Sequence, residues 1–88
     1  MKVEFRASFV KDLRYIKDKG LLSRIKQTIE LVEKAQGTPD MASLKKLKGG
    51  SNYYRIRVGD YRLGLTIEGD RATFVRCLNR KEIYRFFP

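Results

Sequence analysis

The stretch Tyr53–Leu65 constrains the fold most, because its pattern predicts a β-hairpin with a defined register. Gly59-Asp60 is a pair that tolerates the positive φ angles of a tight two-residue turn. With these two residues in the loop, successive side chains alternate between the two faces of the hairpin. One face is then apolar and suited to a core, with Tyr54, Ile56, Val58, Tyr61, Leu63 and Leu65.

The opposite face of this hairpin is basic. It carries Arg55, Arg57 and Arg62 beside Tyr53 and Gly64, and it sets Arg57 directly opposite Arg62. Like charges in this position destabilise a sheet, so the pattern indicates an anionic partner. The alternative that this stretch leaves open is a solvated face on which the arginine side chains lie flat.

The charge of the whole chain favours an anionic partner. The 88 residues have a net charge of +10, and residues 45–88 hold eleven basic and four acidic side chains, a net charge of +7. The basic side chains of this half are mostly arginine, which suits bidentate contacts with phosphate. Nucleic acid is the leading candidate, although an acidic protein or an anionic membrane surface would also fit the charge.

The residue types exclude several kinds of site. The chain has no histidine and one cysteine, Cys77, so an internal disulfide, a histidine zinc site and a histidine triad are excluded. We expect Cys77 to be a small buried hydrophobe in a protein of the reducing cytoplasm. No apolar run reaches the length of a membrane helix, and the N-terminus lacks a signal-peptide core. We therefore expect one cytoplasmic domain over residues 1–88, with no metal, no membrane partner and no small-molecule cofactor.

The spacing of apolar residues predicts the elements before the hairpin. Residues 2–6 alternate as a short strand. Helical spacing predicts one helix over about 9–19, capped by Ser8, and a second over about 21–36. Gly20 would be the left-handed residue that ends the first helix.

The remaining segments complete the fold prediction. We interpret residues 40–51 as a connection anchored by Leu44 and Leu47. Residues 72–78 are apolar on both faces, which predicts an interior strand of undefined register. Residues 79–88 fit either a helical turn or a last short strand. The predicted order, strand, helix, helix and three strands, is a two-layer α+β domain whose helical hairpin covers the apolar face of a mostly antiparallel sheet.

Three segments carry a family resemblance. They are Leu44–Gly49 (LKKLKG), Tyr54–Leu63 (YRIRVGDYRL) and Asn79–Arg85 (NRKEIYR). They resemble the RelE/ParE superfamily of toxins from bacterial and archaeal toxin–antitoxin pairs, and the order of elements is similar over nearly the whole chain. The resemblance implies a RelE-like βααβββ fold, which agrees with the prediction above, and a cognate antitoxin protein as partner.

The resemblance implies two alternative activities. RelE-like members are ribosome-dependent endoribonucleases that cut mRNA, whereas ParE-like members poison DNA gyrase without known hydrolytic chemistry. The RelE-like catalytic set combines several basic residues with a C-terminal tyrosine, and the matching positions here are Arg55, Arg57, Arg62, Arg80 and Tyr84. This complete set favours the nuclease, with the ribosome and mRNA as partners. A basic domain that only binds RNA is a further alternative.

The chain departs from the family pattern at a few positions. Arg55 and Arg57 stand where well-known members have lysine, and Asn79 stands where relatives often have histidine. Arginine keeps its proton, so the candidate general base is Tyr84, for which base stacking or packing is the alternative role. We expect further RNA contacts from neighbouring basic and aromatic side chains: Lys45, Lys46, Lys48, Tyr53, Arg76, Lys81 and Arg85.

Overall fold

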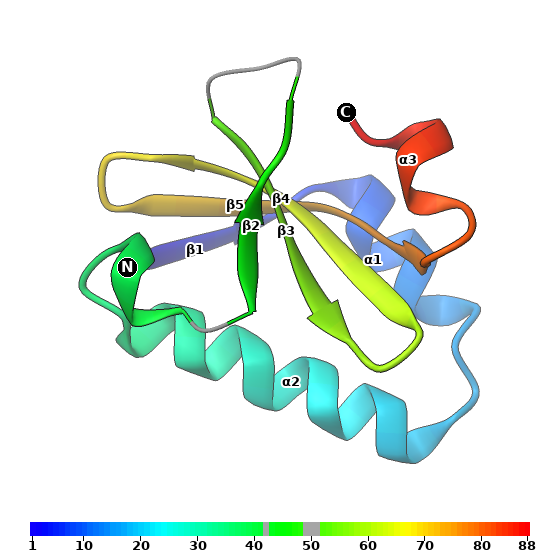
Figure 1. Cartoon of the computed structure of the whole chain (residues 1–88). Coiled ribbons are helices and arrows are strands. Elements are labelled where there is room, and N and C mark those ends of the chain that lie inside the picture. Colours follow the sequence, from blue (N-terminus) through cyan, green and yellow to red (C-terminus); the bar gives the residue numbers. More distant parts are fainter. Residues whose placement is uncertain (42, 49–51) are drawn as a thin grey trace.

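The computed structural model describes residues 1–41, 43–48 and 52–88, and it contains a five-stranded sheet (Figure 1). The strand order is β1-β5-β4-β3-β2, with β1 parallel to β5 and the other pairs antiparallel. The predicted α+β class is confirmed, with an N-terminal strand, a helical hairpin and then an antiparallel sheet. The elements are β1 (Lys2–Phe5), α1 (Ala7–Arg14), α2 (Lys19–Lys34), a 3-10 turn (Thr38–Asp40), β2 (Leu44–Lys46), β3 (Tyr53–Val58), β4 (Tyr61–Glu68), β5 (Arg71–Asn79) and α3 (Ile83–Phe86).

The hairpin of β3 and β4 has the predicted register. Arg57 pairs with Arg62, and Ile56 pairs with Leu63. Gly59 has a φ of 58°, and no residue other than glycine has a positive φ in the described part of the chain. A positive φ at the first turn residue alone is the pattern of a type II′ turn, which matches the twist of the two strands.

The core lies between the sheet and the helices α1 and α2. Ile56 and Leu63 of the apolar hairpin face are buried under the helices, as predicted, in one cluster with Phe9 of α1 and Ile25 of α2. Cys77 of β5 is buried in the same cluster, which confirms the prediction for this residue. Burial, and secondly the nearby Asp12 carboxylate, raise the pKa of Cys77 to about 12, so the thiol stays protonated.

The predicted boundary between the two helices is wrong. Gly20 lies in the first turn of α2 and its φ is not positive. Asp18 caps α2, because its Oδ1 accepts a hydrogen bond from the Leu21 N–H at 3.1 Å. Ser8 lies inside α1, and its hydroxyl donates to the Val75 carbonyl of β5. An aspartate before a helix is a strong N-cap, so α2 begins earlier than the apolar spacing alone indicates.

The segment 40–51 is more than a connection. It contains the short edge strand β2, in which Leu44 pairs with Ile56 and packs on the core. Leu47 continues this pairing, since its N–H donates to the Tyr53 carbonyl at 2.8 Å. The strand was missed because three residues are too few to show an alternating pattern. Residues 42 and 49–51 lie outside the described part.

The C-terminal segment covers part of the face that we expected to be open. It forms the helical turn α3, one of the two predicted alternatives, with Ile83 and Phe87 buried. The Phe87 ring lies over Gly64 of β4 and meets Tyr53 edge to face, with ring centroids 5.6 Å apart. Figure 1 shows α3 beside the C-terminal end of β5. The tail leaves this face exposed near the β3–β4 turn and also at the other end of the sheet, where Thr66 and Thr73 line a hollow.

Candidate nucleic-acid site

The structure brings the five predicted catalytic residues together. Arg55 and Arg57 lie in β3, Arg62 lies in β4, Arg80 follows β5, and Tyr84 lies in α3. Desolvation lowers the pKa of Arg62, and the positive charges of Arg55, Arg57 and Arg80 lower it further, while Tyr84 opposes them. Groups that affect one pKa in this way are close neighbours. We call these five residues the arginine–tyrosine cluster.

Hydrogen bonds hold two of the arginines in place. The Arg55 Nε donates to the Tyr84 hydroxyl oxygen at 3.2 Å, which ties β3 to α3. The Arg62 Nη1 donates to the Gly59 and Tyr61 carbonyls at 3.0 and 2.9 Å, so this side chain folds back over the β3–β4 turn. The turn therefore orients Arg62, and the tail orients Arg55.

The backbone of Arg80 is held by a hydrogen bond, whereas its side chain makes only a weak, exposed ion pair. The Arg80 N–H donates to the Asp60 carbonyl at 2.7 Å, which joins the end of β5 to the β3–β4 turn. The guanidinium makes an ion pair with the Asp60 carboxylate at 4.0 Å, and both side chains are more than half exposed. An exposed pair of this length contributes little, so the guanidinium can turn towards a phosphate at small cost.

The cluster has the chemistry of an anion site. An arginine has five N–H donors, and the described contacts of Arg62 use only its Nη1. Several guanidinium groups around one point stabilise the extra negative charge of a phosphoryl transition state. Tyr84 is 58% exposed, so its oxygen is accessible to a bound substrate. Among the described residues no group of three or more acidic, cysteine or histidine side chains could hold a metal ion.

The structure divides the predicted RNA-contact residues. Lys45 of β2 pairs with Arg55 and lies on the basic face, whereas Lys46 pairs with Tyr54 and lies on the helical face, because side chains alternate along a strand. Arg76 is bound to the buried carboxylate of Asp12 at 2.8 Å and is only 25% exposed. Lys46 is exposed but lies on the other face of the sheet, and Arg76 is held by Asp12, so neither joins the basic face. Tyr53 is half-buried against the tail, and the other predicted contact residues are exposed: Lys45, Lys48, Lys81 and Arg85.

Sequence reasoning missed two contributors to this region. Arg24 of α2 places its Nη1 3.1 Å from the position that a Cβ on Gly59 would occupy, so a further positive charge lies at the β3–β4 turn. Phe86 of α3 is 52% exposed, and the guanidinium of Arg85 lies 5.9 Å from its ring centroid. The pair of aromatic residues at the end of the chain is a sequence signal for Phe86. The sequence of α2 contains no signal that places Arg24 at the turn.

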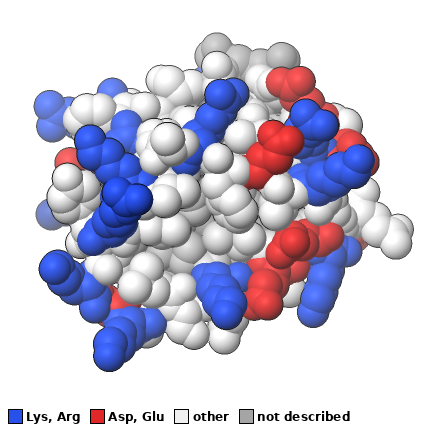
Figure 2. Space-filling view, turned by 180° about the vertical axis from the view of Figure 1, so that it is seen from behind, with Lys and Arg blue, Asp and Glu red and all other residues white. Residues whose placement is uncertain are grey.

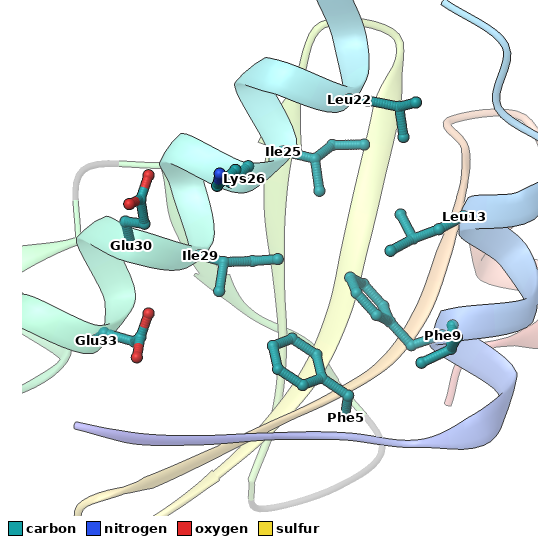
Figure 3. A pocket seen from close by; sticks show the side chains of 10 residues that line it. Phe5, Phe9, Leu13, Leu22, Ile25, Lys26, Ile29, Glu30 and Glu33 are labelled. Carbon is teal, nitrogen blue, oxygen red and sulfur yellow. The ribbon is translucent and has the colours of Figure 1, made fainter. Parts of the chain in front are cut away.

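The gathered surface charge and the apolar hollow under α1 and α2 lie in different places. In Figure 2 lysine and arginine gather along one side of the rear face, while basic and acidic residues mix on the other side with uncharged surface between them. The hollow, of 460 Å³, lies between α1, α2 and β1, and Figure 3 shows apolar side chains such as Phe5, Leu13 and Ile29 around it. It offers a phosphate one cation, Lys26, beside Glu30 and Glu33. We therefore place the candidate site at the arginine–tyrosine cluster.

Comparisons with known proteins identify the family of this chain. Residues 3–84 match the family described as ParE toxin of type II toxin-antitoxin system, parDE. The chain is 46% identical over 89 residues to Toxin RelE3 of Methanocaldococcus jannaschii, and the match covers 100% of both proteins.

Solved structures show the same fold. A chain of the RelB-RelE antitoxin-toxin complex from Methanococcus jannaschii has a TM-score of 0.79 and 43% identity, over 97% of this chain and 99% of that one. A chain of the archaeal RelE-RelB complex from Pyrococcus horikoshii OT3 has a TM-score of 0.73 and 22% identity, over 90% and 93% of the two chains. The chain therefore belongs to the RelE/ParE superfamily of toxins of type II toxin–antitoxin systems, and its similarity to Toxin RelE3 supports the RelE-like branch.

Proposed function

We propose that this toxin is a ribosome-dependent endoribonuclease that cleaves mRNA. The observation that carries the proposal is the arginine–tyrosine cluster, in which Arg55 is hydrogen-bonded to Tyr84 and the charges of the other four residues act on Arg62. The Tyr84 hydroxyl beside Arg55 supports a catalytic role, because it adds a group that can exchange a proton to arginines that can bind a phosphate. The cytoplasm, where ribosomes work, is the proposed location.

The proposed reaction needs no metal. The 2′-oxygen of a ribose attacks the adjacent phosphorus and the bond to the 5′-oxygen breaks. The leaving oxygen takes a proton from solvent, which gives a 2′,3′-cyclic phosphate and a 5′-hydroxyl. Arg55, Arg57, Arg62 and Arg80 would stabilise the added negative charge on the phosphoryl oxygens. Tyr84, whose oxygen lies 3.2 Å from the Arg55 Nε, would accept the proton of the 2′-hydroxyl. The ribosome would supply in-line positioning of the mRNA.

We also propose that a cognate antitoxin binds this chain. A 43%-identical relative was solved as an antitoxin-toxin complex, and the net charge of +10 favours an acidic partner. We expect an acidic or amphipathic antitoxin segment to cover part of the basic face. The two proteins should elute together in gel filtration at low salt, and the complex should weaken as salt is raised. Separate elution at low salt would contradict this partner.

Growth arrest with mapping of mRNA 5′ ends tests the nuclease. Induction of the wild type should stop growth and create new mRNA ends, and Arg62→Ala or Arg80→Ala should abolish both, since losing one such donor costs about 100- to 1000-fold in rate. Arg71→Ala is the matched control, because Arg71 lies at the far end of β5, in an ion pair with Glu4. This control should remain toxic.

Two further variants separate the roles within the cluster. Tyr84→Phe should abolish cleavage if the hydroxyl moves a proton, whereas a stacking role would tolerate Phe and fail with Ala. Arg55→Lys keeps the positive charge and a donor to Tyr84, so it should retain activity. A Tyr84→Phe variant that cleaves normally would leave the nuclease without its proposed base.

The second candidate function is inhibition of DNA gyrase, favoured by the match to a family described as ParE toxin. A gyrase cleavage assay run beside the mRNA mapping distinguishes the two. Two results together would overturn the nuclease proposal. The wild type would trap gyrase–DNA complexes, and mRNA ends would be identical in cells that make the wild type and in cells that make the Arg62→Ala/Arg80→Ala double variant. A protein that binds RNA and gives neither result would be a non-catalytic binder.

A further inference from the structure

Asp12 of α1 is the one buried charged residue in the described part of the chain, at 9% exposure. Its Oδ2 accepts hydrogen bonds from the Arg76 Nε at 2.8 Å and from the Cys77 N–H at 2.9 Å, and its Oδ1 accepts one from the Arg76 Nη2 at 3.1 Å. These bonds raise the pKa of Arg76. A buried carboxylate is costly unless it is fully bonded in this way, so the pair holds a fixed geometry.

Arg76 also contacts the C-terminal tail, so its position affects the position of the tail. Its guanidinium lies 5.5 Å from the ring centroid of Phe86, which is two residues after Tyr84 in α3. The buried anchors of α3 are Ile83 and Phe87. Ile83 begins α3 and Phe87 directly follows it. The Arg76–Phe86 contact adds a third point of attachment between these two anchors and the rest of the protein, so it restricts rotation of α3.

We propose that Asp12 is a positioning residue, which acts through Arg76 and Phe86 to set the orientation of α3 and thus the place of the Tyr84 hydroxyl beside Arg55. Asp12 itself does not reach the arginine–tyrosine cluster. Its catalytic consequence rests on the proposed nuclease function, whereas its effect on the Arg55–Tyr84 hydrogen bond does not.

The competing explanation is that Asp12 only fastens α1 to β5. Ser8 provides the matched control for this explanation. Its hydroxyl also joins α1 to β5, by donating to the Val75 carbonyl. Ser8 lines a hollow together with Phe86 and Phe87, but its removal leaves the Asp12–Arg76 pair and the Arg76–Phe86 contact in place. Ser8→Ala should therefore lower the melting temperature without moving Tyr84.

The first experiment measures the Arg55–Tyr84 contact by NMR, through the Nε–H signal of Arg55 in protein with labelled arginine, beside a thermal melt. Asp12→Asn should shift or broaden this signal, because one amide cannot accept from all the donors that the carboxylate satisfies. Phe86→Leu keeps the Asp12–Arg76 pair and removes only the ring, so it should change the signal while leaving the melting temperature near that of the wild type. Ser8→Ala should show the reverse.

The Arg55 signal in Phe86→Leu and Ser8→Ala can also overturn the proposal. An Arg55 signal unchanged in Phe86→Leu, or changed as much in Ser8→Ala, would show that the network fastens the core and does not position the tail. Phe86→Leu decides the question even if Asp12→Asn fails to fold.

The second experiment measures cleavage of mRNA on purified ribosomes. Asp12→Asn and Phe86→Leu should lower kcat about 10- to 100-fold, as expected for small misplacements of a catalytic group, while the half-saturating ribosome concentration stays the same. Ser8→Ala should change neither quantity per folded molecule. If the wild-type protein cleaves no mRNA, the nuclease proposal is rejected but the NMR result still holds. Failure of the nuclease proposal is therefore distinguishable from failure of the positioning proposal. Equal loss of kcat in all three variants would reject the positioning role.

Discussion

Gly64→Ala tests how the tail is held on the sheet. A Cβ at this position would lie 2.6 Å from the Phe87 Cδ2 and 2.7 Å from its Cγ, closer than carbon atoms approach in proteins. The φ of Gly64 is not positive, so the backbone itself accepts alanine. Overpacking of this kind costs about 1–3 kcal/mol, and replacing a strand glycine by alanine returns about 0.5–1 kcal/mol. We expect a net loss of up to about 2.5 kcal/mol in the free energy of unfolding.

The same substitution should have the opposite sign without the ring. Phe87→Ala alone should cost about 3–5 kcal/mol, as for other buried phenylalanines, and it removes every atom of the predicted clash. Gly64→Ala in that background should then stabilise by about 0.5–1 kcal/mol. Urea denaturation of the wild type, both single variants and the double variant gives the coupling energy.

A coupling energy near zero would refute this reasoning. Gly64→Ala would then act through something other than Phe87, and the tail would not lie over β4. If the coupling is found, Gly64→Ala should also lower mRNA cleavage, since a displaced Phe87 carries α3 and Tyr84 with it.

Three further predictions concern single residues. Arg57→Thr should raise the free energy of unfolding by about 0.2–1 kcal/mol in a denaturation experiment, because it removes a like charge opposite Arg62, and it should lower mRNA cleavage; a loss of stability would contradict the repulsion. Asp18→Ala removes the cap of α2 and should cost about 1 kcal/mol, with cleavage per folded molecule unchanged; unchanged stability would contradict the cap. Cys77, with its pKa raised to about 12, should have roughly one thiolate in ten thousand at pH 8, so a thiol reagent should label it far faster in urea than in the native protein; equal rates would show that the thiol is accessible.

The hairpin was predictable because two independent signals agree on it. Period-two alternation defines which side chains share a face, and the Gly59-Asp60 turn defines which residues pair. Together they give the register of β3 and β4, which the structure confirms. For β5 the sequence offers no such constraint. Its pairing with β4 shifts between Gly64 and Leu65, and an irregularity of this kind has no simple signature in a strand that is apolar on both faces.

The helix boundary and the tail depend on contacts that a pattern does not contain. Gly20 looks like the end of a helix, but Asp18 two residues earlier supplies the stronger signal and moves the boundary. The tail covers the sheet because Phe87 fits over a strand position that has no side chain, Gly64. That fit is visible only after β4 has been placed.

The members of the candidate site were found through the family resemblance, and the structure adds their arrangement. The hairpin alone predicts that Arg55, Arg57 and Arg62 share a face. It cannot predict that Arg80 and Tyr84 join them, because that depends on where the chain turns after β5. It also cannot separate Lys45 from Lys46, since β2 was not recognised as a strand.

The central claim is that the arginine–tyrosine cluster supports attack of a ribose 2′-hydroxyl on the adjacent phosphate, and one substitution in the substrate tests it directly. Purified toxin is mixed with ribosomes carrying a synthetic mRNA, and the cleavage site is mapped. A second mRNA, identical except for a 2′-deoxynucleotide on the 5′ side of the cleaved bond, is then assayed in the same way. Cleavage of the first mRNA to a 2′,3′-cyclic phosphate, with no cleavage of the second at that bond, is the predicted result. Equal cleavage of both, or cleavage of neither, would contradict the account.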